Sequence, residues 1–314
     1  MQLGKGQFME IATEVYKHLL ASSGYKSKLW YILRQILIKL RFDPVCTLPI
    51  HGRELKIPFS HQLPAILKYC RHYDQLPSRI STFIHQNNKH LICIDVGANI
   101  GDTIAAFYSD EEDVFLAIEP NPYFNKVLTV NWAWNNNVTV ISEVCSSESG
   151  VDTFTIIDGK NGTSSIVTAE NGIKMCKMTL DDIVKSYPSA ADVNVIKIDT
   201  DGHDLDVIAG AVKTISKNRP VVLFECEVID NNYIHSCTKT LNTFKSIGYS
   251  SFLLYDSRGN LLGIHSLSDL SLFRDQLLMQ IKEYTHDFEI LLMRNEDIFT
   301  FYQIENEFFS SVLV

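Results

Sequence analysis

From residue 91 onward, short apolar runs alternate with longer amphipathic segments. The runs have the length of buried strands and occupy residues 91–96, 114–119, 138–143, 193–199, 220–226, 250–255 and 288–293. Most of the segments between them are long enough for a crossover helix, for example residues 123–134 and 205–215. This alternation predicts an α/β fold in which a mostly parallel sheet carries helices on both faces.

Residues 151–180 interrupt this rhythm. Apolar and polar positions alternate in residues 151–157 and again in residues 172–178, and the pairs Asp158-Gly159 and Asn171-Gly172 are typical of tight turns. The pattern predicts an antiparallel β-hairpin inserted at the ligand-binding edge of the sheet. Its tip, residues 162–165, is small and polar. The tip fits either a lid over a ligand or a simple surface loop.

The first 85 residues are predicted to be mainly helical. Apolar positions recur at helical spacing in residues 8–22, 28–41 and 63–85, and residues 49–58 favour a short strand pair. A polar stretch at residues 85–90 marks a boundary. We therefore expect an N-terminal extension over residues 1–85, the α/β domain over 86–296, and an apolar C-terminal tail over 297–314 that packs on the domain or on a partner subunit.

Residues 26–41 combine apolar helical positions with basic side chains. The basic residues are Lys26, Lys28, Arg34, Lys39 and Arg41. One interpretation is a helix that packs on the main domain and keeps its lysines in water. The other is a peripheral contact with an anionic membrane surface, for which a basic amphipathic helix is suited.

The overall charge and the cysteine pattern exclude several classes of protein. A net charge of −9 argues against general nucleic-acid binding. The seven cysteines are scattered, odd in number, and lack the spacing of a structural zinc site, which fits a reducing cytoplasm. Neither a secretory leader pattern nor an apolar run of roughly 18 residues is present, so we expect a cytoplasmic protein.

The first predicted strand of the domain leads into a glycine-containing loop. The sequence there reads Asp95-Val-Gly97-Ala98-Asn99-Ile-Gly101, and Asp102 or Thr103 can then cap a helix. This order of strand, loop and helix predicts a nucleotide cradle. The glycine spacing differs from Gly-x-Gly-x-x-Gly, so the dinucleotide form is not expected. The alternative is a tight turn that binds no ligand.

A carboxylate ends the second predicted strand. Glu119 follows Asp95 by 24 residues and is followed by Pro120 and Asn121. An acidic residue at this place in a nucleotide-binding fold can accept hydrogen bonds from ribose hydroxyls. We expect an adenosine-type ligand at the ends of the first two strands, the alternative being that Glu119 only caps the turn at Pro120.

Ionisable side chains crowd the end of the strand at residues 193–199. Asp199 ends this strand, Asp201, His203 and Asp204 follow it, and Glu225 ends the next strand. Carboxylates that crowd together raise one another's pKa, which suits a general base. One of the aspartates can instead cap the helix that follows. Asp199, Asp201, His203 and Glu225 could also hold a divalent metal, an arrangement that we do not favour.

These motifs together resemble the FkbM family of S-adenosylmethionine-dependent methyltransferases. The resemblance covers roughly residues 90–227 and includes the glycine loop, Ile118-Glu-Pro-Asn121, Thr179-Leu-Asp-Asp182, Ile196-Lys-Ile-Asp199 and Pro220-Val-Val-Leu-Phe-Glu225. The family usually has Glu-Gly-x-Glu where this chain has Asp201-Gly202-His203-Asp204, so both acidic side chains are shorter here. Residues 47–85 are similar to the N-terminal part of bacterial members associated with surface glycan clusters.

The resemblance implies a Rossmann-like class I methyltransferase fold with a seven-stranded sheet, and it implies roles for individual residues. S-adenosylmethionine would be bound by Asp95, Gly97, Ala98, Asn99, Gly101, Asp102, Glu119, Pro120, Asn121, Cys145, Ser146 and Asp199, with Cys145 and Ser146 beside the adenine. Asp201, His203 and Glu225 are the candidates for the catalytic base.

The function predicted from the sequence is O-methylation of a sugar hydroxyl in a bacterial surface glycan or its precursor. The partners expected are this glycan or small-molecule acceptor and, in one interpretation, a second copy in a homodimer. Two rival hypotheses are a catalytically degenerate scaffold, suggested by the altered residues 201–204, and a nicotinamide-dependent oxidoreductase. Asn99 within the loop and the lack of a Tyr-x-x-x-Lys pair in the right place argue against the oxidoreductase.

Overall fold

A computed structural model describes residues 5–87, 89–159, 162–228, 230–283 and 287–312 of the chain. Its centre is a sheet with the strand order β13-β12-β14-β11-β10-β3-β4-β5. Strands β3, β4, β5, β10 and β11 pair in parallel, whereas β14 runs antiparallel to both of its neighbours, β11 and β12. This order confirms the predicted Rossmann-like class I methyltransferase fold.

All seven predicted strands are present within two residues of their expected ends. They are β3 (Ile92–Val96), β4 (Val114–Ile118), β5 (Val138–Ile141), β10 (Val195–Ile198), β11 (Val221–Cys226), β12 (Ser251–Asp256) and β14 (Phe288–Leu292). The predicted count was nevertheless too low, because β13 (Leu261–Ser266) pairs with β12 and gives the sheet an eighth strand. Most side chains of β13 are only partly buried, so its sequence lacks the apolar run that revealed the others.

Helices cover both faces of the sheet, as predicted, because neighbouring residues of a buried strand point to opposite faces. On one face Cys93, Phe115 and Val195 pack with helices α4 (Leu76–Gln86), α5 (Asp102–Phe107), α6 (Pro122–Trp132) and α12 (Asn295–Val312). On the other face Ile94 and Ile196 pack with α7 (Leu180–Ser186), α8 (Asp204–Ala209), α9 (Val212–Asn218), α10 (Asn231–Ile247) and α11 (Ser271–Glu283). The two packed faces bury the sheet on both sides.

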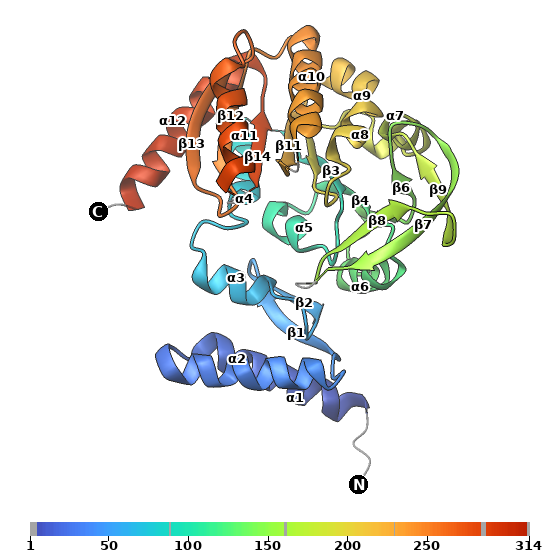
Figure 1. Cartoon of the computed structure of the whole chain (residues 1–314), viewed down its shortest axis with the longest axis vertical. Helices are drawn as coiled ribbons and strands as arrows, with labels where there is room; N and C mark the ends of the chain where they lie inside the picture. The colour runs from blue at the N-terminus through green and yellow to red at the C-terminus, as the bar shows by residue number, and fades with distance from the viewer. Residues whose placement is uncertain (1–4, 88, 160–161, 229, 284–286, 313–314) are drawn as a thin grey trace.

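The insertion after β5 is larger than the predicted hairpin. Strands β7 (Gly150–Asp158) and β9 (Ile173–Met178) pair antiparallel as expected. The segment between them adds a further strand, β8 (Ser164–Thr168), which pairs with the other edge of β7. With the short β6 (Val144–Cys145) these strands form a separate four-stranded sheet beside the main one (Figure 1).

The N-terminal segment contains helices α1 (Lys5–Ala21) and α2 (Gly24–Lys39), strands β1 (Val45–Ile50) and β2 (Arg53–Pro58), and helix α3 (Leu63–Tyr69). The predicted helix over residues 63–85 is therefore two helices, α3 and α4, with Pro77 in the first turn of α4. Helices α1 and α2 lie side by side at one end of the molecule (Figure 1). Among the described residues, no helix is long and apolar enough to cross a membrane.

The predicted apolar tail is the helix α12, and an ion pair holds it to α4. Arg79 in α4 donates to both carboxylate oxygens of Glu305 in α12, at 2.6 and 2.9 Å. The hydroxyl of Tyr255 in β12 donates to the same carboxylate at 2.9 Å, and Glu305 is fully buried. The Arg79 guanidinium also lies over the Phe308 ring. These contacts join the N-terminal segment, the sheet and the end of the chain.

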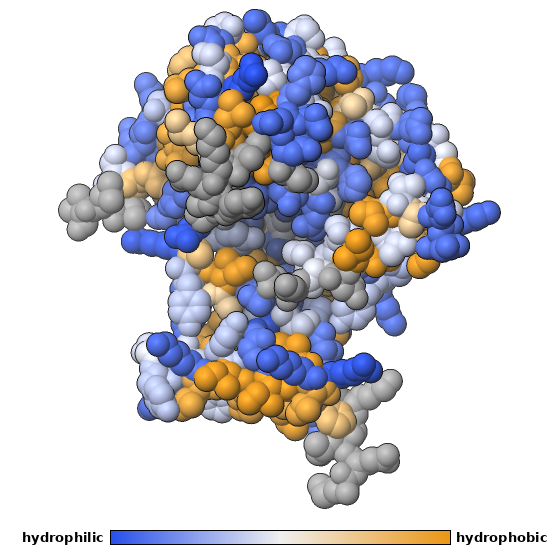
Figure 2. Space-filling model, in the orientation of Figure 1, coloured by the Kyte–Doolittle hydropathy of each residue, from blue (hydrophilic) through white to orange (hydrophobic). Residues whose placement is uncertain are grey.

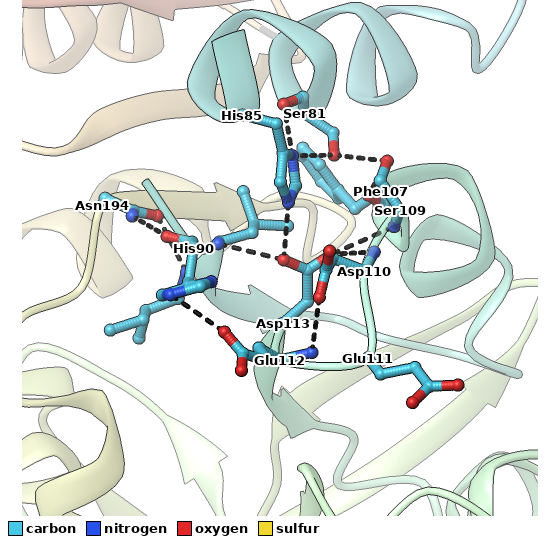
Figure 3. Close-up of polar contacts among 12 residues, drawn as sticks. Ser81, His85, His90, Phe107, Ser109, Asp110, Glu111, Glu112, Asp113 and Asn194 are labelled. Atoms are coloured by element: carbon cyan, nitrogen blue, oxygen red, sulfur yellow. Dashed lines mark hydrogen bonds and ion pairs between the residues drawn. The ribbon is translucent and has the colours of Figure 1, made fainter. Parts of the chain in front are cut away.

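The buried carboxylate of Asp113 binds His85 and Leu91 on either side of the predicted domain boundary. Figure 3 shows the polar contacts of Asp113. Asp113, just before β4, accepts hydrogen bonds from Nε2 of His85 at 2.8 Å and from the backbone N–H of Leu91 at 3.0 Å. The backbone N–H groups of Ser109 and Asp110 donate to its other oxygen. Burial opposes protonation of His85, but its hydrogen bonds to the Ser81 carbonyl and to Asp113 raise the pKa of its imidazole. Helix α4 is thereby anchored at the start of the sheet.

Candidate active site

A cavity of about 400 Å³ lies beyond the carboxyl ends of β3, β4 and β10. Strand β3 pairs with β4 on one side and with β10 on the other, so the chain order reverses there. Open α/β sheets bind their ligands in the crevice at such a switch point. The inserted sheet contributes a second wall through Asp152, Phe154, Ser164 and Lys177.

Most of the residues predicted to bind a cofactor or act in catalysis line this cavity. They are Gly97, Asn99, Asp102, Glu119, Pro120, Cys145, Ser146, Asp199, Asp201 and His203. The structure places the remaining five, Asp95, Ala98, Gly101, Asn121 and Glu225, outside the lining.

The glycines of the loop after β3 are required by contacts within the protein. Gly97 has a φ of 82°, and a β-carbon there would collide with the backbone carbonyl of Asp199. Gly101 has a φ of 84°, and its position is closed by the indole of Trp132, which donates to the Gly101 carbonyl at 3.0 Å. Gly101 is also the N-cap of α5, and no side chain makes the expected cap through Asp102 or Thr103. Glycine is therefore required at position 97 by the backbone just after β10, and at position 101 by a side chain of α6.

Glu119 is buried at the end of β4 with its carboxylate at the cavity. Its Oε2 accepts the backbone N–H of Asn99 at 2.9 Å, and its Oε1 accepts the backbone N–H of Asn121 at 2.7 Å. Burial raises the pKa of Glu119 to about 7, against the effect of these two hydrogen bonds. Each carboxylate oxygen keeps a second lone pair for another donor, because a carboxylate has about four acceptor sites.

Asp95 is fully buried behind the cavity wall and faces Lys197 of β10. Lys197 Nζ lies 3.6 Å from Asp95 Oδ1 and 3.0 Å from Asp199 Oδ2. Burial raises the pKa of Asp95 to about 6, although the Lys197 ammonium opposes this. Among the described residues, none donates to Asp95 with normal hydrogen-bond geometry. Its ion-pair partner Lys197 itself lines the cavity.

The turn after β10 brings Asp201 and His203 to the cavity. Asp201 has a φ of 50°, and partial burial together with the Asp199 and Glu227 carboxylates raises its pKa to about 6. His203 is the N-cap residue of α8 but makes no side-chain cap. Asp204 is buried in the first turn of α8, where its Oδ2 accepts the Thr200 hydroxyl at 3.2 Å. No aspartate caps this helix in the way that the sequence suggested.

Glu225 lies in β11 opposite Glu289 of β14, away from the cavity lining. Burial and the nearby Asp199 carboxylate raise its pKa well above the usual value. Within the described part of the chain, no three or more His, Cys, Asp and Glu side chains are arranged to hold a metal ion. Asp199, Asp201, His203 and Glu225 are thus not gathered in one such group among the residues described.

Several residues that line the cavity have no role predicted from the sequence, and the most informative of them is His61 of the N-terminal segment. The backbone N–H of Leu63 donates to its Nδ1 at 3.2 Å, which leaves the proton of the neutral ring on Nε2. Burial lowers the pKa of His61 to about 4, against the effect of the nearby Asn99 side chain. Among the described residues, none accepts a hydrogen bond from Nε2 with normal geometry. The other ionisable lining residues without a predicted role are Tyr73, Asp152, Lys177, Lys197 and Asp206. Of these, Lys197 lies within the motif Ile196-Lys-Ile-Asp199, whose position could have drawn attention to it.

The tip of the inserted sheet rests on the loops after β3 and β4. Asn99 Nδ2 donates to the carbonyl of Gly162 at 3.1 Å, and Asn121 Nδ2 donates to the hydroxyl of Ser164 at 2.8 Å. Residues 160 and 161 lie outside the described residues. The described part of the tip thus borders the cavity, which favours the lid interpretation of residues 162–165 over that of a loop directed only at solvent.

The motif Thr179-Leu-Asp-Asp182 has a structural role. The Thr179 hydroxyl accepts the backbone N–H of Asp182 and caps α7. The Asp181 carboxylate accepts the backbone N–H groups of Lys213 and Thr214 at the start of α9. The motif therefore fixes two helices beneath the sheet.

Comparison with known proteins agrees with this geometry. The family described as "Methyltransferase FkbM domain" matches residues 95–251, which is half of the chain. The hexuronic acid methyltransferase AglP of Haloferax volcanii is 31% identical over 131 residues, which are 41% of this chain and 53% of that protein. The chain therefore matches about half the length of this relative.

Solved structures with a similar arrangement are more distant in sequence. The methyltransferase FkbM from Methylobacillus flagellatus is 17% identical, with a TM-score of 0.38 over 65% of this chain and 43% of that one. The METTL16 methyltransferase domain is 11% identical, with a TM-score of 0.44 over 93% of this chain and 92% of that one. On the family match to residues 95–251, this chain belongs to the FkbM family of methyltransferases.

Proposed function

We propose that the protein transfers a methyl group from S-adenosylmethionine to a hydroxyl group of a sugar. The observation that carries this proposal is the charge of the cavity at the ends of β3, β4 and β10. Its lining contains six carboxylates, from Asp102, Glu119, Asp152, Asp199, Asp201 and Asp206. Two lysines and no arginine are found among the described lining residues. Such a cavity favours a cationic ligand.

The same charge argues against the rival oxidoreductase. A nicotinamide dinucleotide carries a pyrophosphate, which folds of this type bind at a helix N-terminus behind a glycine-rich loop. Here the first turn of α5 holds the partly buried carboxyl of Asp102, whose pKa is raised to about 7 by desolvation and by Asp74. A carboxylate at that place repels a phosphate, whereas it attracts the ammonium and sulfonium groups of S-adenosylmethionine.

The lining residues fit the parts of this cofactor. Glu119 keeps free lone pairs for the ribose hydroxyls, and Cys145 and Ser146 would border the adenine. Gly97, Asn99 and Asp199 would lie beside the methionine part. The cofactor supplies a methyl group on a positively charged sulfur. The chain then has to align an acceptor oxygen with that methyl group and exclude water.

A sugar hydroxyl also has to lose its proton as it attacks. Asp201 and His203 are the candidate bases, because both line the cavity beside Asp199. A pKa of about 6 leaves Asp201 mostly ionised at neutral pH yet more basic than an ordinary aspartate, which suits this role. Glu225 remains a weaker candidate, since it lies outside the lining.

The class of acceptor is inferred from the relative of known activity. AglP is described as a hexuronic acid methyltransferase, and its similarity to this chain supports a sugar acceptor in a glycan or glycan precursor. The acceptor would lie between the inserted sheet and the N-terminal segment, where Lys177 and His61 line the cavity.

The test is a calorimetric titration of the purified full chain with S-adenosylmethionine and S-adenosylhomocysteine, followed by incubation with sugar nucleotides and glycan lipids. We expect binding of both ligands, and a product heavier than its acceptor by one methyl group. Absence of binding would refute the proposal. Binding without methylation of any acceptor would favour the catalytically inactive scaffold.

A further inference from the structure

Helix α2 packs with its apolar side outward. Tyr25, Leu29, Ile32, Leu33, Ile36 and Leu40 recur every three or four residues along one face, and all are exposed, with Tyr25 at 75% and Ile32 at 54%. Figure 2 shows this face as a continuous hydrophobic band at the end of the molecule that carries the N-terminal helices. A contiguous exposed patch of this kind marks an interaction site.

The opposite face of α2 is buried and contains polar side chains. Arg34 is fully buried, and its guanidinium donates to the carbonyls of Phe59 and Ser60 at 2.9 and 2.6 Å and lies 4.6 Å from the centre of the Tyr16 ring. The Ser27 hydroxyl bonds to that of Tyr69 at 2.7 Å. These contacts fix the rotation of the helix. Turning the apolar face inward would break the hydrogen bonds of Arg34 and leave the carbonyls of Phe59 and Ser60 without this donor.

Basic residues flank the apolar face on both sides. At 100° per residue, Lys26 lies on one side of the face and Lys28 and Lys39 lie on the other, and all three are exposed. The helix contains no Asp or Glu, although the whole chain has a net charge of −9. Positive charge is thus concentrated beside the one apolar band of α2.

We propose that this face of α2 docks on a lipid bilayer whose surface carries anionic headgroups. The apolar side chains would enter the interface while Lys26, Lys28 and Lys39 contact the headgroups, which is the arrangement of an interfacial amphipathic helix. A second copy of the chain is the less suitable occupant. In a two-fold dimer the same face meets itself, so lysines would oppose lysines with no carboxylate of α2 to pair with them.

The docking face is connected to the cavity wall by short contacts. Arg34 of α2 and the Tyr16 hydroxyl of α1 both donate to the carbonyl of His61, at 3.1 and 2.6 Å. His61 in turn lines the cavity. The bilayer would therefore lie next to the N-terminal wall of the site. The docking proposal itself does not depend on which acceptor the enzyme methylates.

The test is co-sedimentation of the purified full chain with sucrose-loaded vesicles. We expect binding to phosphatidylcholine vesicles that contain about 30 mol% phosphatidylglycerol, and at least roughly tenfold weaker binding to phosphatidylcholine alone. Raising the salt concentration from about 0.1 to about 0.5 M should weaken binding to the anionic vesicles.

Three variants separate the contributions. Ile32→Ser with Ile36→Ser removes apolar surface without adding charge, and Lys26→Gln with Lys28→Gln and Lys39→Gln removes the flanking charge. Each should weaken binding at least roughly tenfold. Leu272→Ser with Met279→Ser is the matched control. Both residues lie on α11 and are at least as exposed as Ile32 and Ile36, so this variant should bind vesicles like the wild type.

The outcomes are distinct. Absence of wild-type binding to anionic vesicles would overturn the proposal, and so would full binding by the Ile32/Ile36 variant. A dimer in analytical ultracentrifugation that this variant dissociates, without vesicle binding, would assign the face to a second copy. S-adenosylmethionine titration of the same variants separates the two proposals, because cofactor binding should be unchanged in all of them.

Discussion

The ammonium of Lys197 lies 3.0 Å from the carboxylate of Asp199, and on its other side it faces the fully buried Asp95 at 3.6 Å. Burial disfavours the charge of Lys197, but these two carboxylates keep its pKa well above the usual value. The Lys197 ammonium therefore pairs with two carboxylates, one at the end of β3 and one just after β10. This arrangement leads to the first prediction.

Replacing Lys197 with Met should destabilise the fold. The change leaves Asp95 buried without a counter-charge, and breaking a buried ion pair from one side costs about 3–5 kcal/mol. The free energy of unfolding from urea denaturation measures this loss. Adding Asp95→Asn to the same variant should restore part of the stability, because the amide carries no charge. If Lys197→Met is as stable as the wild type, the ion pair has no role in stability.

Glu119→Gln should weaken the binding of S-adenosylmethionine. The substitution keeps the shape of the side chain but removes a charged acceptor, which is worth about 1.5–3 kcal/mol. Calorimetry should therefore show a Kd roughly 10- to 150-fold higher. The matched control is Glu111→Gln, an exposed residue before β4, which should bind normally. Unchanged affinity of the Glu119 variant would remove Glu119 from the cofactor site.

Asp201→Asn and His203→Gln separate the two candidate bases. Loss of the true base should lower kcat by roughly 10²- to 10⁴-fold and leave the Kd for the cofactor within a few-fold of the wild type. The measurement is steady-state methyl transfer, once an acceptor is known, together with calorimetry. If both variants turn over at the wild-type rate, the proton is taken by another group, and Glu225 is the next residue to change.

The stabilisation by S-adenosylmethionine should increase with pH. Burial raises the pKa of the Asp102 and Glu119 carboxyls to about 7 each, above their values in the unfolded chain. Their contribution to stability is therefore complete below about pH 4 and is lost as the pH rises through 7. A cationic ligand in the cavity favours the ionised form of these carboxylates. It therefore offsets the lost stability only at a pH high enough for the carboxylates to be ionised.

Melting temperatures with and without ligand check this expectation. The gain in Tm on adding S-adenosylmethionine should be larger at about pH 8 than at about pH 5, and the gain from S-adenosylhomocysteine, which lacks the sulfonium charge, should rise less. Equal gains at both pH values would show that the cavity carboxylates do not respond to the charge of the ligand.

The strands of the main sheet could be predicted because each is marked by a local pattern, an apolar run with turn residues within a few positions of its end. Residues 91–96 and 114–119 are apolar runs that are followed by turn residues. Each run contains a strand of the structure, and polar residues follow at its carboxyl end. Glu119, Asp199, Asp201 and His203 lie at the cavity for the same reason, since parallel strands bring their ends together.

The features that the sequence could not predict are contacts between distant parts of the chain. Asp95 is predicted from its place in a motif to bind the cofactor, but the direction of its side chain depends on Lys197, 102 residues later, and its carboxylate lies behind the cavity wall. His61 was missed because it reaches the cavity through the packing of α1 and α2, which no local pattern reports. Strand β13 was missed because an edge strand needs little apolar sequence.

The pair of Arg79 and Glu305 has a consequence for synthesis on the ribosome. The two residues are 226 positions apart, and at roughly 5–20 residues per second the first waits about 10–45 seconds for the second. During that time the guanidinium of Arg79 lacks its carboxylate. Tyr255 is made 50 positions before Glu305, so its hydroxyl waits only about 2–10 seconds. Until α12 emerges, the sheet face that it covers is open to aggregation and to chaperone binding.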